Sequence, residues 1–437
     1  MNRPDPVSLA EAFRYWLKLG FISFGGPAGQ IAMMHRELVE RRRWISEQRF
    51  LHALNYCMLL PGPEATQLAV YIGWLMHRTR GGIIAGALFV LPSLLLLMLL
   101  SWIYLAFGAV PAVAGVLYGI KPAVVAIVLA AAWRIGTRTL RNAALITLAA
   151  LAFMAISLLH IPFPAVVLGA ALAGWLGGRY LPGHFSPGGH AATSAPASYG
   201  PALIGDDTPT PPHALFSSRR LALTVAMGLL LTVGVWLLLA ALTGIRNPPA
   251  QMGWFFTKAA MLTFGGAYAV LPYVYQGAVD HYHWLTPGQM IDGLALGETT
   301  PGPLIMIVAF VGFVGGWTHE VFGSWPGLGG IAGAATAAWF TFVPSFLFIL
   351  VGGPLVEATR GNIRMTAPLT AISAAVVGVI ASLAVFFGAH VFHAAARWDW
   401  TAIAMAAAGA LALMRYRVGT ITLLAACAAV GLALHGW

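Results

Sequence analysis

Charged residues are scarce in this chain of 437 amino acids. Asp, Glu, Lys and Arg make up 9% of it, whereas soluble globular domains are about a quarter charged. This scarcity excludes an ordinary soluble enzyme. Cysteine is scarce as well, because the chain has two, Cys57 and Cys427, which lie far apart in apolar sequence. A disulfide framework and a CxxC metal or redox motif are therefore excluded.

Several catalytic motifs are also missing. No Walker A, GxSxG or HExxH sequence occurs, so nothing supports ATP hydrolysis or the common hydrolase mechanisms. A membrane-embedded enzyme is disfavoured because no paired acid and base and no metal cluster emerges, and we expect no metal and no cofactor. The net charge of +10 does not indicate nucleic-acid binding, since the positive residues lie between apolar segments.

Long apolar runs are what the chain has in abundance. Hydrophobic residues make up 59% of it and the mean hydropathy is +0.80. A helix needs about 20 apolar residues to cross a bilayer. The chain is therefore predicted to be an all-α polytopic membrane protein. Apolar runs lie at about 82–107, 112–133, 143–160, 163–178, 220–243, 328–354, 367–393, 398–414 and 418–436.

A polar segment divides these runs into two groups. Residues 180–218 are rich in Pro, Gly, Ser and Thr, which is typical of a flexible linker. We expect an N-terminal repeat at 1–179, this linker at 180–218, and a C-terminal repeat at 219–437. Within the last, residues 219–249 supply an extra crossing span.

The second half repeats the first. Lys18, Phe24-Gly25-Gly26, Trp44 and Pro61-Gly62-Pro63 recur 240 positions later as Lys258, Phe264-Gly265-Gly266, Trp284 and Pro301-Gly302-Pro303. After an insertion of 12 residues, Leu91-Pro92-Ser93 matches Val343-Pro344-Ser345 and Ala123-Val124-Val125 matches Ala375-Val376-Val377. Similarity among apolar helices explains shared Ala and Val, but it does not explain a shared Lys, Trp and two Gly/Pro breaks.

Arginine distribution predicts how the halves are oriented. Residues 19–107 carry seven Arg, whereas the matching stretch 259–359 carries no Lys or Arg. By the positive-inside rule, the first broken region faces the cytoplasm and the second faces outward. The N-terminus and the linker are then cytoplasmic, although Arg246 and Arg397 do not fit. This predicts two inverted-topology repeats with discontinuous helices, a pattern of secondary transporters.

The Pro-Gly-Pro sequences lie within apolar stretches, where proline removes a backbone donor and interrupts the helix. Irregular backbone at membrane depth is tolerated only where protein buries it or where it lines a wet cavity. Each break therefore indicates a site. If its flanks form a re-entrant hairpin, Arg49 and Arg78 lie on the same side of the membrane. A spanning broken helix is the alternative.

Three lysines stand out because all lie within apolar sequence: Lys18, Lys121 and Lys258. Such residues normally face a cavity or a partner, since a lysine at the bilayer centre costs about 2.5–3.5 kcal/mol on insertion scales. Lys18 and Lys258 are repeat mates, so one interpretation is a pair of cations that converge on an anion. The other is snorkelling to an interface or pairing with Glu11.

The breaks themselves suit anion binding. Glycine permits positive φ and close backbone approach, and a following half-helix offers free N–H groups and the positive end of its dipole. Hydroxyl and amide groups can donate to an oxyanion, whereas ionised acids cannot. Glu64 and Glu298 instead suggest proton coupling or counter-charges, with N-capping as the alternative for Glu64. The substrate-binding candidates are Lys18, Phe24, Gly25, Gly26, Asn55, Pro61, Gly62, Pro63, Thr66, Gln67, Lys121, Lys258, Phe264, Gly265, Gly266, Thr299, Thr300, Pro301, Gly302 and Pro303.

These motifs resemble the chromate ion transporter family in its long two-domain form. FGGPAGQIAMMHRELVERRRWISEQRF and LLPGPEATQLAVYIGW resemble the signature of the first domain. FGGAYAVLPY and WLTPGQMIDGLALGETTPGPL resemble that of the second. The resemblance covers nearly the whole chain apart from the linker. It implies a bacterial inner-membrane exporter of chromate with sulfate as a competitor; family members with one domain per chain are thought to pair as antiparallel partners.

The expected function is thus a secondary active transporter that exports chromate or a sulfate-like oxyanion by alternating access. An importer of sulfate or another small anion and an anion channel of the same architecture are the alternatives. Expelling a dianion across an inside-negative potential of about 100 mV gains roughly 2 × 2.3 kcal/mol. The lipid bilayer is the surrounding medium, and a homodimer is left open.

Overall fold

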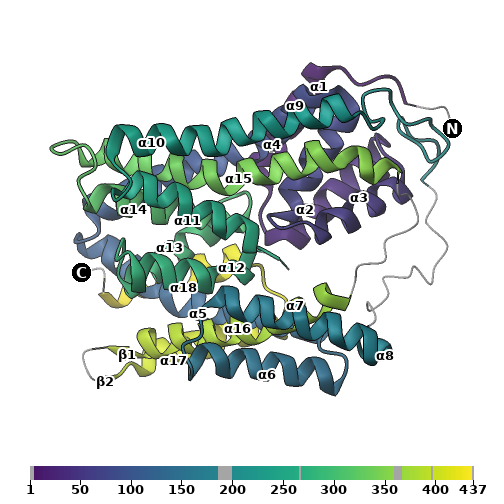
Figure 1. Cartoon of the computed structure of the whole chain (residues 1–437). Helices are drawn as coiled ribbons and strands as arrows, with labels where there is room; N and C mark the ends of the chain where they lie inside the picture. Colours follow the sequence, from purple (N-terminus) through teal and green to yellow (C-terminus); the bar gives the residue numbers. More distant parts are fainter. Residues whose placement is uncertain (1–3, 186–198, 265–266, 359–366, 395–396, 436–437) are drawn as a thin grey trace.

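The computed structural model describes residues 4–185, 199–264, 267–358, 367–394 and 397–435, and nearly all of their regular structure is helical (Figure 1). The N-terminal half contains α1 (Leu9–Ile22), α2 (Gly26–His35), η1 (Arg36–Arg41), α3 (Glu47–Leu59), α4 (Glu64–Phe107), α5 (Pro111–Thr139), α6 (Ala143–Ser157), α7 (Phe163–Tyr180) and α8 (Pro182–Phe185).

The C-terminal half has a comparable order of elements. It contains α9 (Ser218–Leu229), η2 (Leu230–Gly234), α10 (Val235–Thr243), α11 (Pro248–Leu262), α12 (Ala267–Tyr275), η3 (Gln276–His281), α13 (Pro287–Thr299), η4 (Leu304–Met306), α14 (Ile307–Thr318), α15 (Pro326–Ala358), α16 (Ala367–Phe392), α17 (Trp400–Met414) and α18 (Thr420–His435). Strands β1 (His393–Ala394) and β2 (Arg397–Trp398) form a short antiparallel pair.

Five helices of the described chain are long and apolar enough to cross a membrane. They are Glu64–Phe107, Pro111–Thr139, Ser218–Thr243, Pro326–Glu357 and Ala367–Phe392, and they coincide with five of the predicted runs. The other four runs coincide with α6, α7, α17 and α18, which have 15, 18, 15 and 16 residues. The all-helical membrane architecture is therefore confirmed.

Local signals explain where several helices begin. The side chains of Ser8 and Ser46 accept hydrogen bonds from the backbone N–H groups of α1 and α3. Thr286 and Gln289 form a capping box at the start of α13. These side chains satisfy donors that the first helical turn leaves without partners.

Helix α4 is two helices that fold back on each other. The backbone leaves helical geometry at His77 and Arg78, which separates a first arm (residues 64–76) from a second arm (residues 79–107). A Cβ atom on Gly73 would lie 2.4 Å from the carbonyl oxygen of Gly81, so the two arms pack closely through glycine. Helices α14 and α15 pack in the same way, since a Cβ atom on Gly312 would lie 2.3 Å from the carbonyl oxygen of Gly333.

The last helices of each half pack against the other half. Helices α6 and α7 contact α16, whereas α17 and α18 contact α5. The contact between α5 and α18 is close, because a Cβ atom on Gly119 would lie 2.0 Å from the carbonyl oxygen of Cys427. Small residues permit such an approach of helices in membrane proteins.

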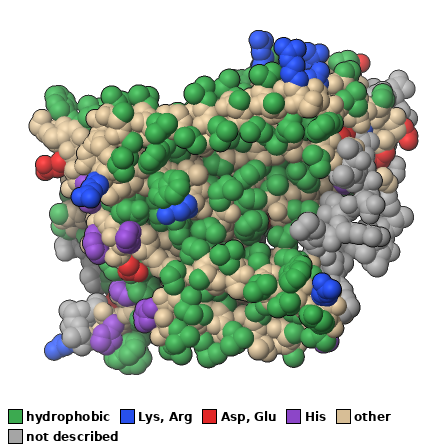
Figure 2. Space-filling view, viewed as in Figure 1, with side chains coloured by type: hydrophobic (Ala, Val, Ile, Leu, Met, Phe, Trp, Pro, Cys, Tyr) green, Lys and Arg blue, Asp and Glu red, His purple; other side chains and the backbone are tan. Residues whose placement is uncertain are grey.

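Apolar side chains cover the outside of the molecule as well as its core. On the face drawn in Figure 2, hydrophobic side chains occupy a broad area, and charged side chains lie mostly near its edges. The Ser218–Thr243 span is the extreme case, since 6% of its most apolar window is buried. Such a surface suits contact with lipid.

The described part of the predicted linker is docked rather than free. Ile204 forms a parallel bridge with Ile45, and the backbone N–H groups of Leu203 and Ile204 donate to the carbonyl oxygens of Arg43 and Trp44. Ser46 Oγ donates to Asp206 Oδ1 over 2.5 Å. We refer to residues 199–217 as the docked segment. Its polar composition predicted a tether, but a few apolar residues such as Ile204 anchor it.

Candidate functional site

The two Pro-Gly-Pro breaks are both built around a glycine in a conformation that L side chains rarely adopt. Gly62 lies between α3 and α4 with φ 120°, and Gly302 lies between α13 and η4 with φ 105°. Glycine enters this region of backbone space without a steric penalty. The predicted interruptions at the two breaks are therefore present in the structure.

Each break is hydrogen-bonded to the other half of the chain. The N–H group of Gly62 donates to the carbonyl oxygen of Thr263 over 2.7 Å, and that of Gly302 donates to the carbonyl oxygen of Ser23 over 2.9 Å. Ser23 follows α1 and Thr263 follows α11, and these residues are also 240 positions apart. The two bonds thus form a reciprocal pair that satisfies backbone groups at four helix ends.

A buried serine from the opposite half lies against each glycine. A Cβ atom on Gly62 would lie 2.3 Å from Ser345 Oγ, and one on Gly302 would lie 2.7 Å from Ser93 Cβ. Ser93 is on the second arm of α4 and Ser345 is on α15. These helices pack against each other, so the contacts bring both breaks to the α4–α15 crossing.

Two glutamines complete the surroundings of the breaks. Gln30 Nε2 donates to the carbonyl oxygens of Ser23 over 3.1 Å and of Gly302 over 2.5 Å. Gln67 Nε2 donates to the carbonyl oxygen of Pro61 over 2.7 Å. We define the polar junction as the buried residues Ser23, Gln30, Thr66, Gln67, Ser93 and Ser345.

Several polar side-chain atoms of the polar junction have no hydrogen-bond partner among the described residues. In the described part of the chain, the hydroxyl oxygens of its serines and threonine and the Oε1 atoms of its glutamines are buried without a hydrogen-bond partner. Buried polar atoms are usually paired, and each exception calls for an explanation such as a ligand or water. Hydroxyl groups can donate to oxyanions or accept from other donors.

The predicted lysine pair does not reach the polar junction. Lys18 is exposed on the face of α1 that also carries Phe21, and Lys258 is exposed on α11 with its ammonium 5.4 Å from the centre of the Trp254 ring. Lys18 shares the exposed face of α1 with Arg14 as well as Phe21, and Lys258 lies beside the exposed Trp254. This placement agrees with the interfacial alternative rather than with convergence on an anion.

Other predicted residues are dispersed. Asn55 is exposed. Thr299 Oγ1 and Thr300 Oγ1 donate to carbonyl oxygens of their own helix. Glu64 is half-buried directly after its break, whereas Glu298 accepts a hydrogen bond of 2.5 Å from the hydroxyl of Tyr268.

The structure describes the first Phe-Gly-Gly sequence in full and the second in part. Gly25, between α1 and α2, has a φ of 91°, and Gly26, the first residue of α2, has a φ of 70°. Phe24 is half-buried beside them. In the second copy Phe264 is half-buried, while Gly265 and Gly266 lie outside the described residues.

Two charged clusters, not recognised in the sequence, flank the polar junction. In the Glu357 cluster, the hydroxyl of Tyr71 donates to Glu357 Oε1, and Glu357 Oε2 lies 3.9 Å from Arg49 Nη2. Arg49 Nη2 also donates to the carbonyl oxygen of Thr208 over 2.7 Å, which places the docked segment over this cluster.

The Asp292 cluster has a similar composition. The hydroxyl of Tyr104 donates to Asp292 Oδ2 over 2.9 Å, and Lys121 Nζ lies 3.3 Å from Asp292 Oδ1. These residues line a pocket of about 390 Å³. Lys121, a substrate-binding candidate from the sequence, is therefore paired with a carboxylate and lines a pocket.

Within the described residues, no group of three or more His, Cys, Asp and Glu side chains could hold a metal ion. The site is thus defined by helix breaks, buried hydroxyl and amide groups, and flanking ion pairs inside long apolar helices. This combination defines a polytopic helical membrane protein whose polar interior lies at discontinuous helices, as in transporters.

The chain belongs to the chromate transporter family, whose model matches residues 10–175 and 250–432. It is 34% identical to a chromate transport protein of Pseudomonas aeruginosa over 86% of this chain and 80% of that protein. It is 29% identical to a chromate transport protein of Cupriavidus metallidurans over 87% and 86% of the two chains. A probable chromate transport protein of Synechococcus elongatus is 28% identical over 88% and 86%. No solved structure matches the chain.

The chromate transporter family is a family of membrane transporters, not of enzymes. The paired matches at 10–175 and 250–432 agree with the long two-domain form that the sequence motifs indicated. They leave out the whole docked segment and the first span of the second half.

Proposed function

We propose that this transporter exports chromate, or a closely similar dianion, from the bacterial cytoplasm by alternating access. In this proposal the two halves have opposite orientations in the inner membrane, and the polar junction binds the anion. The observation that carries the proposal is the reciprocal bonding of Gly62 and Gly302 to the opposite halves, beside buried hydroxyl groups without partners.

The helix connections support opposite orientations. The first hairpin, α3 and the first arm of α4, has its open end at Arg49 and Arg78, where both residues lie near the docked segment. The second arm of α4 starts there and ends near Tyr104, which bonds to Asp292 in the first half of α13. A helix of this length spans about 40 Å, so the second hairpin opens at the far end of the molecule.

Chemistry supports the polar junction as an anion site. A dianion with four oxygens needs donors from several directions, and Ser93 and Ser345 supply hydroxyl groups from two different helices. In a buried site such hydrogen bonds to a charged group contribute about 1.5–3 kcal/mol each. The lysines are not needed for this arrangement. Glu64 and Glu298 flank the breaks and remain our candidates for proton coupling.

The arginine distribution supports the direction of the proposal. The open end of the first hairpin carries the arginine-rich region, so the positive-inside rule assigns it, the N-terminus and the docked segment to the cytoplasm. Export then follows the membrane potential, since expelling a dianion at about 100 mV sustains a gradient of roughly 2,000-fold.

The test is uptake of labelled chromate into inside-out vesicles, with an interior-positive potential imposed or collapsed and sulfate added as competitor. We expect saturable uptake that depends on the potential and that sulfate inhibits. No uptake under any gradient, with sulfate flux intact, would reject chromate as substrate and leave the transporter architecture standing. Flux without saturation or counterflow would instead identify a channel.

The binding site is tested by removing single hydroxyl groups. Ser93→Ala and Ser345→Ala should each raise the KM for chromate about tenfold, which corresponds to about 1.4 kcal/mol. Ser101→Ala is the matched control, because Ser101 is also buried on α4 but its hydroxyl donates to Leu97 within the helix. An unchanged KM in both test variants would reject the polar junction as the site.

A further inference from the structure

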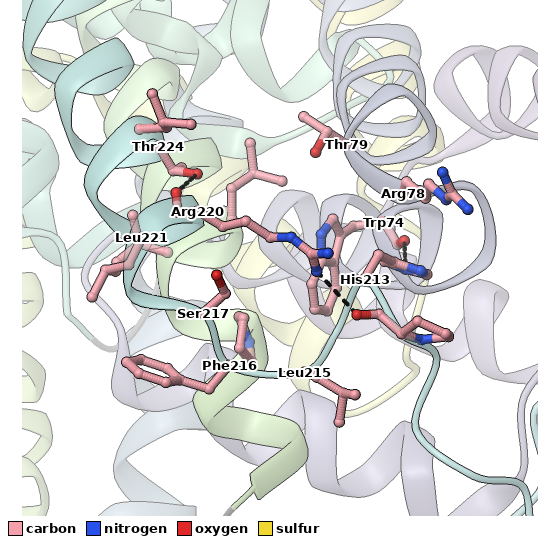
Figure 3. Close-up of a pocket in the computed structure, with 15 residues that line it drawn as sticks. Trp74, Arg78, Thr79, His213, Leu215, Phe216, Ser217, Arg220, Leu221 and Thr224 are labelled. Carbon is pink, nitrogen blue, oxygen red and sulfur yellow. Dashed lines mark hydrogen bonds between the residues drawn. The ribbon is translucent and has the colours of Figure 1, made fainter.

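A second pocket, of about 450 Å³, lies away from the polar junction. Figure 3 shows it between the bend of α4, the end of the docked segment and the start of α9. Arg78 and Trp74 come from α4, His213 and Ser217 from the docked segment, and Arg220 from α9. Residues of α15 close the remaining wall.

The pocket is strongly basic. Arg78 and Arg220 line it, none of its lining residues is acidic, and neither arginine forms an ion pair with any residue that the structure describes. In the view of Figure 3 the two arginine side chains lie on either side of His213.

The two arginines also affect the pKa of His213. Burial lowers its pKa, and the charges of Arg78 and Arg220 lower it further, although the hydrogen bond with the carbonyl oxygen of Trp74 and the charge of Glu357 act in the opposite direction. His213 Nε2 lies 2.9 Å from that oxygen. The histidine is thus held as a wall of the pocket between two guanidinium groups.

Arg78 occupies an unfavourable backbone conformation. Its φ and ψ are 58° and −159°, a region that is essentially restricted to glycine. Strained residues of this kind persist where the surrounding structure holds them and often lie at functional sites. The bend of α4 therefore places an arginine at a position where glycine would have less backbone strain.

The other side of the pocket continues into a lipid-facing surface. Leu215, Phe216 and Leu223 are 56%, 61% and 62% exposed, and all three line the pocket. Leu215 and Phe216 directly precede the Ser218–Thr243 span and Leu223 lies in its first turns; 6% of the most apolar window of this span is buried. The pocket thus joins two cations to an exposed apolar strip at the end of a membrane-spanning helix.

We propose that this pocket binds the phosphate headgroup of an anionic phospholipid, whose acyl chains then lie along α9. Arg220 donates to the carbonyl oxygen of Pro212 through Nη1, and a guanidinium group has five N–H donors, so donors remain for phosphate oxygens. Basic pockets beside membrane-spanning helices recognise such headgroups, and the apolar strip distinguishes a lipid from a free anion. The assignment does not depend on the transported substrate.

The experiment measures binding of short-chain phosphatidylglycerol to the purified protein by native mass spectrometry. Phosphatidylcholine of the same chain length, inorganic phosphate and sulfate are measured in parallel. The test variant is Arg78→Gly with Arg220→Gln, since glycine suits the backbone at position 78. The matched control is Arg80→Gln with Arg219→Gln, which removes the same charge from neighbouring residues that do not line the pocket.

We expect the test variant to bind phosphatidylglycerol at least tenfold more weakly than the wild type, while the control stays within twofold. Arg220→Gln alone provides an independent check with at least a threefold loss, since its exposed side chain is dispensable for folding. Equal weakening in test and control, or no weakening in either, would overturn the proposal. Phosphate or sulfate binding as tightly as the lipid would show a small-anion site instead.

Discussion

The Glu357 and Asp292 clusters are built alike but exposed differently. In each, a tyrosine of α4 donates to a carboxylate that faces a cation. The Arg49 and Glu357 side chains are 4% and 2% exposed beneath the docked segment. Asp292 is similarly buried, with its side chain 5% exposed, but its partner Lys121 is 33% exposed at the pocket. We interpret this difference as a transporter closed at the Glu357 end and more open at the Asp292 end.

Our proposed transport cycle assigns different parts to the centre and to the two ends. Because the polar junction has the same reciprocal bonds in both halves, we take it as the fixed centre of that cycle. The clusters at the two ends differ in solvent access and are suited to act as alternate gates. A buried ion pair is costly to break from one side, because the remaining charge is left uncompensated.

The largest effect is expected at the shared centre. Gly62→Val and Gly302→Val introduce a β-branched side chain at positive φ, and the new Cβ atoms would lie 2.3 Å from Ser345 Oγ and 2.7 Å from Ser93 Cβ. We expect each variant to lose more than about 4 kcal/mol of stability and all transport. Thermal unfolding in detergent and chromate uptake measure both.

The control for these variants is Gly169→Ala. Gly169 lies in α7, and a Cβ atom there would meet no heavy atom within 4 Å, so stability should change by less than about 0.5 kcal/mol. If Gly62→Val unfolds the protein but Gly302→Val does not, the two breaks are not equivalent supports of the fold.

The next effect distinguishes the two clusters. Glu357→Gln should destabilise the protein by about 3 kcal/mol, because the buried Arg49 loses its carboxylate partner. A thermal shift measures the change, and Glu320→Gln, at an exposed glutamate, is the control. A shift no larger than that of the control would mean that the Glu357 cluster does not hold its end closed.

A smaller effect is expected from Asp292→Asn. Asp292 is buried, but Lys121 is 33% exposed at the pocket. The lysine left without its partner therefore stays hydrated, and the cost should be about 1 kcal/mol rather than that of an uncompensated buried charge. A double-mutant cycle with Lys121→Met isolates this coupling. Coupling as large as that of Arg49 with Glu357 would remove the difference from which we inferred the open and closed ends.

The sequence predicted the fold features that depend on local chemistry. Proline and glycine at Pro61-Gly62-Pro63 and Pro301-Gly302-Pro303 interrupt helices whatever surrounds them, and the long apolar runs became helices. Leu91-Pro92-Ser93 and its mate were recognised as a repeat, but their serines were not recognised as site residues. A polar residue retained at both copies inside apolar helices was the available signal.

Pairings across the chain could not be predicted. Tyr71 with Glu357 and Tyr104 with Asp292 are separated by 286 and 188 positions, and no local pattern relates them. The docked segment was missed for a similar reason, since its polar composition hides Ile204 and Ala214, which are buried against the first half.

The positions of the lysines along their helices did not predict the direction in which their side chains point. Residues 248–262 are apolar on several faces, so periodicity does not reveal which face of that helix is exposed. In residues 9–22, by contrast, Glu11, Arg14 and Lys18 already share one polar face. In the structure Lys18 and Lys258 share their exposed faces with Phe21 and Trp254. Depth in the membrane had suggested an interior site, but the orientation of each helix gives the lysine an outer one.

The smallest effect is therefore expected from Lys18→Ala and Lys258→Ala, alone or together. Each should change the KM for chromate and the maximal flux less than twofold, because neither side chain reaches the polar junction. Ser93→Ala and Ser345→Ala, measured in the same vesicles, set the scale for a residue at the site. A tenfold loss of affinity in Lys258→Ala would mean that α11 rotates its cation inward in another state, and the centre would then not be fixed. An unchanged Lys258→Ala beside an impaired Ser345→Ala would leave neutral hydroxyl donors as the anion's ligands.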